Sequence, residues 1–193
     1  MKEKIIKVDD QREIIVLDDA YNYAEISGFY KSAIEMNYQI YNSSDAECQH
    51  QEDHRRLAAR LDIGCPFIGA IFKPEVTEYL KKHIPQDRFK GERAYMNLGI
   101  HSDEHRSHVD QFNVGFGKTV LVYINKKWDV DWGGETAFYD DKREELLYMS
   151  QIVPGRILIF DGSIPHSAKP QHFHAQPYRF TLAIKFAAHG LYS

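Results

Sequence analysis

Short β-type segments separated by turn signals fill the sequence after residue 90, and they constrain the fold more than any other feature. Most of these segments are rich in β-branched or aromatic residues, and turn-rich stretches separate them. The segments run over residues 94–98, 119–125, 151–153, 156–160 and 179–186. Gly-Gly at 133–134 and Pro-Gly at 154–155 supply turns. Because no helical crossover pattern separates these strands, we expect a jelly roll or sandwich and not βαβ units.

The first ninety residues show mainly helical patterns. After short strand patterns at 5–8 and 14–17, Asp18-Asp19 offers an N-cap for a helix over 21–36. A polar helical pattern follows over 44–61, with Ser44 as its N-cap, and Pro74 begins another helix. We therefore expect one domain over 1–193, with a mostly helical support region at 1–89 and a β core at 90–187.

The composition agrees with a compact, β-rich unit. The chain has 193 residues, of which 43% are hydrophobic and 13% aromatic. This is enough apolar side chain for a sizeable core, and aromatic residues pack well on pleated sheets. The net charge of −4 gives no global field that would attract a phosphate backbone. The basic cluster His54-Arg55-Arg56 with Arg60 is interpreted as the solvated face of a helix, so nucleic acid is not an expected partner.

Cysteine usage and hydropathy predict a cytoplasmic protein. Cys48 and Cys65 are the only cysteines and lack metal or redox spacing, so a disulfide framework is not expected. The first residues are too polar for a signal peptide. No later segment approaches the roughly 20 apolar residues of a membrane span.

Three residues form a candidate metal site. His108 and Asp110 are two positions apart, so at a strand end they project to one side, and His166 follows a later strand and Pro165. Two histidines and one carboxylate are the facial triad of non-haem Fe(II) oxygenases, which leaves adjacent positions open on the metal. Unrelated surface residues are the alternative. His101 and Asp103 make a competing pair, but His108 lies nearer the strand at 119–125 and is preferred.

The last strand carries a candidate carboxylate anchor. Arg179 and Thr181 are two positions apart and share one face. A guanidinium fork suits a carboxylate, so Arg179 is expected to hold a dicarboxylate inside the barrel, with Thr181 as a further donor. A surface ion pair is the alternative for Arg179. Asn97, on the strand that leads toward the site, is a weaker candidate.

Several of these motifs, in this order, resemble the 2-oxoglutarate and iron(II)-dependent oxygenases of the prolyl hydroxylase type. The resemblance spans residues 90 to 187. It rests on His108-Val109-Asp110, Thr119 to Asn125, Trp128, Gly133 to Thr136, Gly155 to Phe160, His166 and Arg179 to Thr181. It implies a double-stranded β-helix, Fe(II) on His108, Asp110 and His166, and 2-oxoglutarate held by Arg179 and Tyr123. Core packing is the alternative for Tyr123.

The resemblance also implies an activity. The expected reaction uses O2 to hydroxylate a C–H bond and releases succinate and CO2, and ascorbate is a further cofactor that the likeness allows. A peptidyl proline or another protein side chain is the favoured substrate. A free amino acid or small metabolite is the first alternative, and a non-catalytic cupin-like binding module is the second. Related nucleic-acid demethylases have a second Arg where this chain has Lys185, which argues against nucleic acid.

Overall fold

Antiparallel strands dominate the computed structural model, which describes residues 1–42, 55–101, 103 and 105–189. A large sheet has eight strands in the order β1-β2-β9-β6-β11-β5-β4-β3. The bounds are β1 Lys2–Lys7, β2 Glu13–Asp18, β3 Gln39–Asn42, β4 Arg55–Leu61, β5 Phe89–Gly99, β6 Gly117–Tyr123, β9 Ile157–Asp161 and β11 Arg179–Ala188. Every pair in this sheet is antiparallel.

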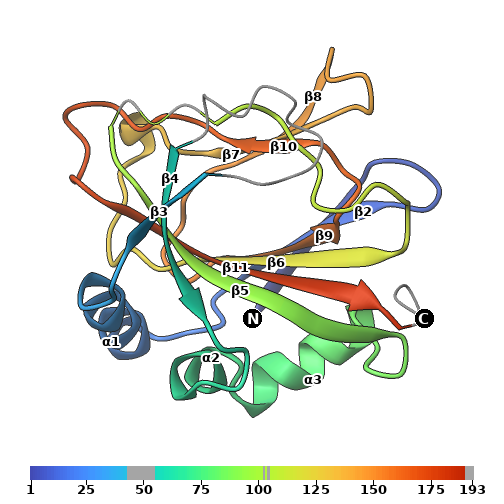
Figure 1. Ribbon diagram of the computed structural model, residues 1–193, viewed down its shortest axis with the longest axis horizontal. Coiled ribbons are helices and arrows are strands. Elements are labelled where there is room, and N and C mark those ends of the chain that lie inside the picture. The colour runs from blue at the N-terminus through green and yellow to red at the C-terminus, as the bar shows by residue number, and fades with distance from the viewer. Residues whose placement is uncertain (43–54, 102, 104, 190–193) are drawn as a thin grey trace.

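A small sheet lies across the inner face of the large one (Figure 1). It consists of β7 Thr136–Tyr139, β8 Leu146–Ser150 and β10 His166–Ala168, in the order β10-β7-β8. Along the chain, β7 and β8 lie between β6 and β9 of the large sheet, and β10 lies between β9 and β11, so the chain winds between the two layers. The fold is the expected double-stranded β-helix. A 3-10 turn, η1 Val130–Trp132, precedes the glycine pair Gly133 and Gly134, which both have positive φ.

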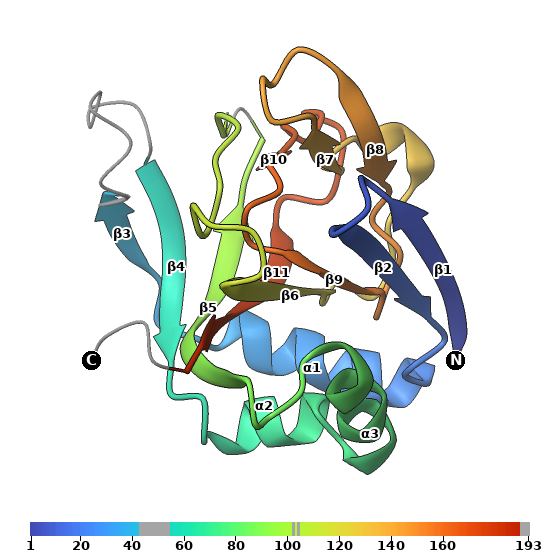
Figure 2. The same ribbon diagram turned by 90° about the vertical axis from the view of Figure 1, so that its right-hand side faces the viewer.

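Three helices cover the other face of the large sheet (Figure 2). They are α1 Tyr23–Ile34, α2 Pro66–Ile71 and α3 Pro74–His83. Between helices and sheet lies an apolar core that includes Phe29, Ile71, Met96 and Leu182. The helix predicted to begin at Pro74 is confirmed as α3. Proline suits the first helical position, because its φ is already helical and its missing N–H would have no partner within the helix.

The first helix begins later than expected. Asn22 caps α1, because its side chain accepts from the Glu25 backbone while Glu25 accepts from the Asn22 backbone. The predicted cap at Asp18-Asp19 is wrong. Asp18 instead pairs with Arg156 across the sheet at 2.8 Å, and Asp19 has a φ of 59°.

The mostly helical region expected over residues 1–89 is found only in part, since this stretch also supplies β1 to β4. The helical prediction for 44–61 is wrong over 55–61, where β4 pairs with β5. Arg60 is therefore exposed on a strand. The predicted N-cap Ser44, the cysteine Cys48 and the first residue of the basic cluster, His54, lie outside the described residues.

One strand after residue 90 is also corrected. Residues 151–153 form no strand, and the chain pairs just before them, in β8. The other four predicted strands are confirmed within a few residues as β5, β6, β9 and β11. In the described part of the chain, no helix is both long and apolar enough to cross a membrane.

Candidate metal and co-substrate site

The three predicted metal ligands meet between the two sheets. His108 and Asp110 come from the segment before β6, and His166 begins β10. The Nε2 atom of His108 lies 3.6 Å from Oδ1 of Asp110, and Nε2 of His166 lies 3.5 Å from Oδ2. One ligand atom from each of the three residues lies within 4.8 Å of the others. Such a cluster can hold one small divalent cation.

Backbone pairing fixes this meeting. His108 and His166 form an antiparallel bridge, with N–O distances of 3.0 and 2.9 Å in the two directions. The backbone N–H of Asp110 donates to the carbonyl of Gly162 at 2.8 Å. Segments that are far apart in the sequence are therefore in register at the ligands themselves. The bridge explains why His108 and not His101 lies in the cluster, since among the described residues His101 and Asp103 belong to no such group.

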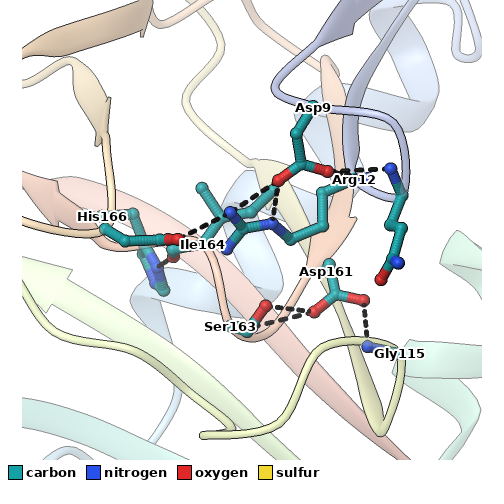
Figure 3. Close-up of polar contacts among 9 residues, drawn as sticks. Asp9, Arg12, Gly115, Asp161, Ser163, Ile164 and His166 are labelled. Carbon is teal, nitrogen blue, oxygen red and sulfur yellow. Dashed lines mark hydrogen bonds and ion pairs between the residues drawn. The ribbon is translucent and has the colours of Figure 1, made fainter.

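Hydrogen bonds set which ring nitrogen of each histidine faces the cluster. Nδ1 of His166 lies 3.0 Å from the carbonyl of Ile164, and Nδ1 of His108 lies 3.3 Å from the carbonyl of Arg106. A carbonyl only accepts, so Nδ1 carries the proton and Nε2 presents its lone pair. Figure 3 shows the His166 contact beside Asp161, whose carboxylate accepts from Ser163 and from the Gly115 backbone. This network shapes the turn that leads into His166.

The electrostatics of the cluster also suit a cation. Burial by itself would raise the pKa of Asp110, but Lys185, His166 and His108 outweigh it and hold that pKa well below its usual range. Burial lowers the pKa of His166 to about 3. At neutral pH the site therefore presents an ionised carboxylate and a neutral imidazole, which are the forms that bind metal.

A row of polar groups leads away from the cluster along the inner face of the large sheet. Thr181 on β11 stands opposite Asn97 on β5, and Arg179 stands opposite Gly99. All four residues line the cavity that also contains His108 and His166. Oδ1 of Asn97, Nε of Arg179 and Oγ1 of Thr181 are buried without a hydrogen-bond partner among the described residues. Buried polar atoms of this kind normally have a partner, so the cavity wall is built to receive a polar molecule.

Arg179 lies at the deep end of this row. It is 7% exposed, and burial lowers its pKa. Its guanidinium donates to Oγ1 of Thr136 at 3.3 Å and packs 5.8 Å from the ring centre of Tyr123. Gly134 makes room for it, since a Cβ there would lie 3.3 Å from Cδ of Arg179. A buried cation that contacts only neutral groups among the described residues can pair with the carboxylate of a ligand.

Tyr123 has a different place from the other candidates. Its hydroxyl donates to Thr136 at 2.8 Å, and its side chain is fully buried. Tyr123 contacts Thr136 and Arg179, and Arg179 is the residue expected to bind the carboxylate of the co-substrate. The structure therefore relates Tyr123 to the co-substrate through these two neighbours. The sequence analysis missed Thr136, which lines the cavity and contacts both residues. The Gly-Gly-Glu-Thr run contains the signal that could have indicated it.

The sequence analysis also missed Lys185 and Thr119 as site residues. Both donate to Oδ2 of Asp110, Thr119 at 2.6 Å. Lys185 continues the alternation that begins at Arg179, and this period of two could have indicated its position. His105, from the loop between β5 and His108, also lines the cavity.

A family model described as the 2OG-Fe(II) oxygenase superfamily matches residues 93–186. The expected resemblance to this superfamily is confirmed. The match runs from within β5 to within β11 and contains His108, Asp110, His166 and Arg179. It supports the general chemistry of a dioxygenase that uses Fe(II) and 2-oxoglutarate. A search of curated proteins gives no match.

Solved structures with similar folds include a Pseudomonas putida prolyl-4-hydroxylase, with 15% identity and a TM-score of 0.66 over 92% of this chain and 93% of that one. A Trichoplax adhaerens prolyl hydroxylase in complex with a peptide fragment of hypoxia inducible factor has 15% identity and a TM-score of 0.68, over 90% and 83%. The carbocyclase SnoK from nogalamycin biosynthesis has 9% identity and a TM-score of 0.67, over 92% and 80%. At these identities the likeness concerns the fold.

The residues present fit Fe(II) and 2-oxoglutarate. The donor set of two imidazoles and one carboxylate is of the kind that binds Fe(II). The unpartnered groups of Asn97, Arg179 and Thr181 are on the same cavity wall as the metal cluster, and Arg179 supplies the positive charge that one end of a dicarboxylate needs.

Proposed function

We propose that the protein is an Fe(II)- and 2-oxoglutarate-dependent dioxygenase that hydroxylates a C–H bond. The observation that carries the proposal is one cavity lined by His108 and His166 of the His-Asp-His cluster and by the buried Arg179, which forms no ion pair with a carboxylate among the described residues. A cupin-like binding module would need the three metal-binding residues but would not need the buried Arg179. A single domain and a cytoplasmic location stay predictions from the sequence.

Each residue has a defined task in this proposal. His108, Asp110 and His166 hold the metal through Nε2, a carboxylate oxygen and Nε2. Arg179 binds the distal carboxylate of 2-oxoglutarate, and Thr181 and Asn97 lie beside it along the wall. Tyr123 and Thr136 keep Arg179 in place from behind. When bound, the metal and co-substrate would supply the O2-dependent chemistry that converts 2-oxoglutarate to succinate and CO2 and hydroxylates the substrate, and ascorbate is proposed as a reductant that maintains the ferrous state.

For the substrate we propose a protein or peptide side chain, with proline first. Two structural neighbours, a prolyl-4-hydroxylase and a prolyl hydroxylase in complex with a peptide fragment, support this class. Residues 99–107 and 126–132 are the proposed selecting loops, since loops on a shared scaffold vary with substrate. The likeness to SnoK keeps a small-molecule substrate as the second candidate.

The first experiment tests the chemistry. Fe(II) and 2-oxoglutarate added together without oxygen should give a weak visible charge-transfer band in the wild-type protein and none in Asp110→Ala. A wild-type protein without the band would contradict the assignment of the site.

The second experiment tests the substrate. Succinate formation is screened with proline-containing peptides, free amino acids and single-stranded nucleic acid, after subtraction of uncoupled turnover. Stimulation by peptides is expected. Stimulation by a free amino acid alone would refute the peptidyl substrate and leave the chemistry in place.

A further inference from the structure

The two carboxylate oxygens of Asp110 have different surroundings. Oδ2 accepts a hydrogen bond from Oγ1 of Thr119 at 2.6 Å and contacts Nζ of Lys185. Oδ1 faces Nε2 of His108 at 3.6 Å. Oδ2 also lies 3.5 Å from Nε2 of His166, so each oxygen of Asp110 faces one histidine of the cluster, and Oδ2 alone receives two further donors.

The fold brings the two donors to this oxygen. Thr119 on β6 and Lys185 on β11 are directly opposite each other in the sheet register, and both project to the inner face. The side chains are well buried, with Thr119 1% exposed as a residue and the Lys185 side chain 14% exposed. A lysine amine at such depth is held by its partners and does not sample solvent freely.

We propose that Thr119 and Lys185 form a clamp on Oδ2 of Asp110, which fixes the orientation of this carboxylate toward His108 and His166 and favours Fe(II) over Fe(III). The inference rests on the proposed function. The two members act differently. Thr119 is neutral, so it orients the carboxylate for any divalent metal. Lys185 adds a positive charge behind a ligand, and its repulsion grows with the charge of the metal ion.

The charge on Lys185 affects the two iron states unequally. An ammonium group repels a trivalent ion more than a divalent one at the same distance, and partial burial keeps water from screening the difference. Groups behind the metal ligands tune the redox properties of a site in this way. Lys185 is therefore a positioning residue with an electrostatic consequence that a purely structural lysine would not have.

The orienting role is tested with Thr119→Val and Thr119→Ser. Calorimetric titration with Mn(II) should show about tenfold weaker binding for the valine variant, in the range measured for partners of metal ligands, and near wild-type binding for the serine variant. Circular dichroism confirms that each variant is folded. Equal Mn(II) affinity of wild type and Thr119→Val would overturn the orienting role.

The charge role is tested with Lys185→Met, Lys185→Gln and Lys185→Arg. In a mediated redox titration followed by the EPR signal of high-spin Fe(III), both neutral variants should prefer Fe(III) at least about tenfold more than wild type, a fall in potential of about 59 mV for one electron. Lys185→Arg should stay near wild type. Lys82→Met, which removes an exposed lysine beside Tyr79 on α3, is the matched charge control and should show no change. An unchanged potential in a folded neutral variant would refute the electrostatic role.

The two proposals fail in distinguishable ways. Wild-type protein that binds neither Mn(II) nor Fe(II) would refute the proposed function together with the clamp. Wild-type protein that binds these metals, with variants that behave identically, would refute the clamp alone.

Discussion

The two faces of the large sheet are built from the same strands but are filled in opposite ways. On β11, Phe180, Leu182 and Ile184 pack into the helix-covered core, where all are nearly inaccessible. The alternate residues Thr181, Ala183 and Lys185 face the cavity. One face is thus closed by apolar packing, while the other combines a second apolar cluster with buried polar atoms that have no partner among the described residues.

This difference shows how one strand serves stability and chemistry together. Burial of apolar side chains against α1, α2 and α3 stabilises the fold, so the opposite face can keep a cavity beside its own apolar cluster, which includes Leu121 and Phe160. Groups such as Arg179 and Thr181 are costly there, because polar atoms are buried without a partner among the described residues. The inner face can carry them since its strands are anchored from outside. Variants on the two faces should therefore affect different measurements.

The largest loss of metal affinity is expected when one of the three predicted metal ligands is removed. Asp110→Ala removes one of three ligands and should weaken Mn(II) binding by more than about a hundredfold, beyond the loss seen when only a partner of a ligand is removed. His108→Ala and His166→Ala should behave alike. Circular dichroism should show a folded protein, because the helix-side core is untouched. Retained binding in His108→Ala with loss in His101→Ala would reverse the assignment.

On the outer face, Leu182→Ala should lower the free energy of unfolding by about 2–5 kcal/mol through lost burial and a cavity. Its neighbour provides the matched control. Thr181→Val keeps the shape and removes a hydroxyl without a partner among the described residues, so stability should not fall. Urea denaturation measures both. Equal destabilisation by the two variants would contradict the division of faces.

At the deep end of the cavity, Arg179→Ala should raise the 2-oxoglutarate requirement by about one to two decades. The reason is the loss of a charge-assisted contact worth roughly 1.5–3 kcal/mol. Mn(II) affinity should change little, because Arg179 touches none of the three metal residues. Calorimetry with each ligand separates the two effects. An unchanged affinity for 2-oxoglutarate would remove Arg179 from the co-substrate site.

A smaller effect is expected at high pH on the helix side. The Tyr21 hydroxyl donates to the carbonyl of Ile71 at 2.9 Å, and burial raises its pKa. Because the folded pKa lies above the unfolded value of about 10, this stability is complete below pH 10 and is lost as the pH rises further. Tyr21→Phe should reduce the alkaline slope by up to about 1.4 kcal/mol per pH unit. Denaturant titrations at pH 9, 10 and 11 measure it, and identical slopes would contradict the prediction.

The sequence by itself determined the parts that depend on near neighbours and on motif order. The sequence was sufficient to predict the β-rich half and the helix from Pro74. It also gave the spacing of the candidate site residues His108, Asp110, His166 and Arg179. Residues 55–61 were not, because Arg, Leu and Ala favour helices locally and only pairing with β5 makes this segment a strand.

Only the tertiary structure decided which distant groups meet. The bridge between His108 and His166 selects one His-x-Asp pair over another, and carbonyl contacts select Nε2 as the metal-facing atom. The register of β6 against β11 places Thr119 and Lys185 on the same carboxylate oxygen. A sequence pattern reports which face a side chain takes on its own strand. Contacts at hydrogen-bond distance depend on how strands far apart in the chain align, and a shift of one residue would turn these side chains to the opposite face.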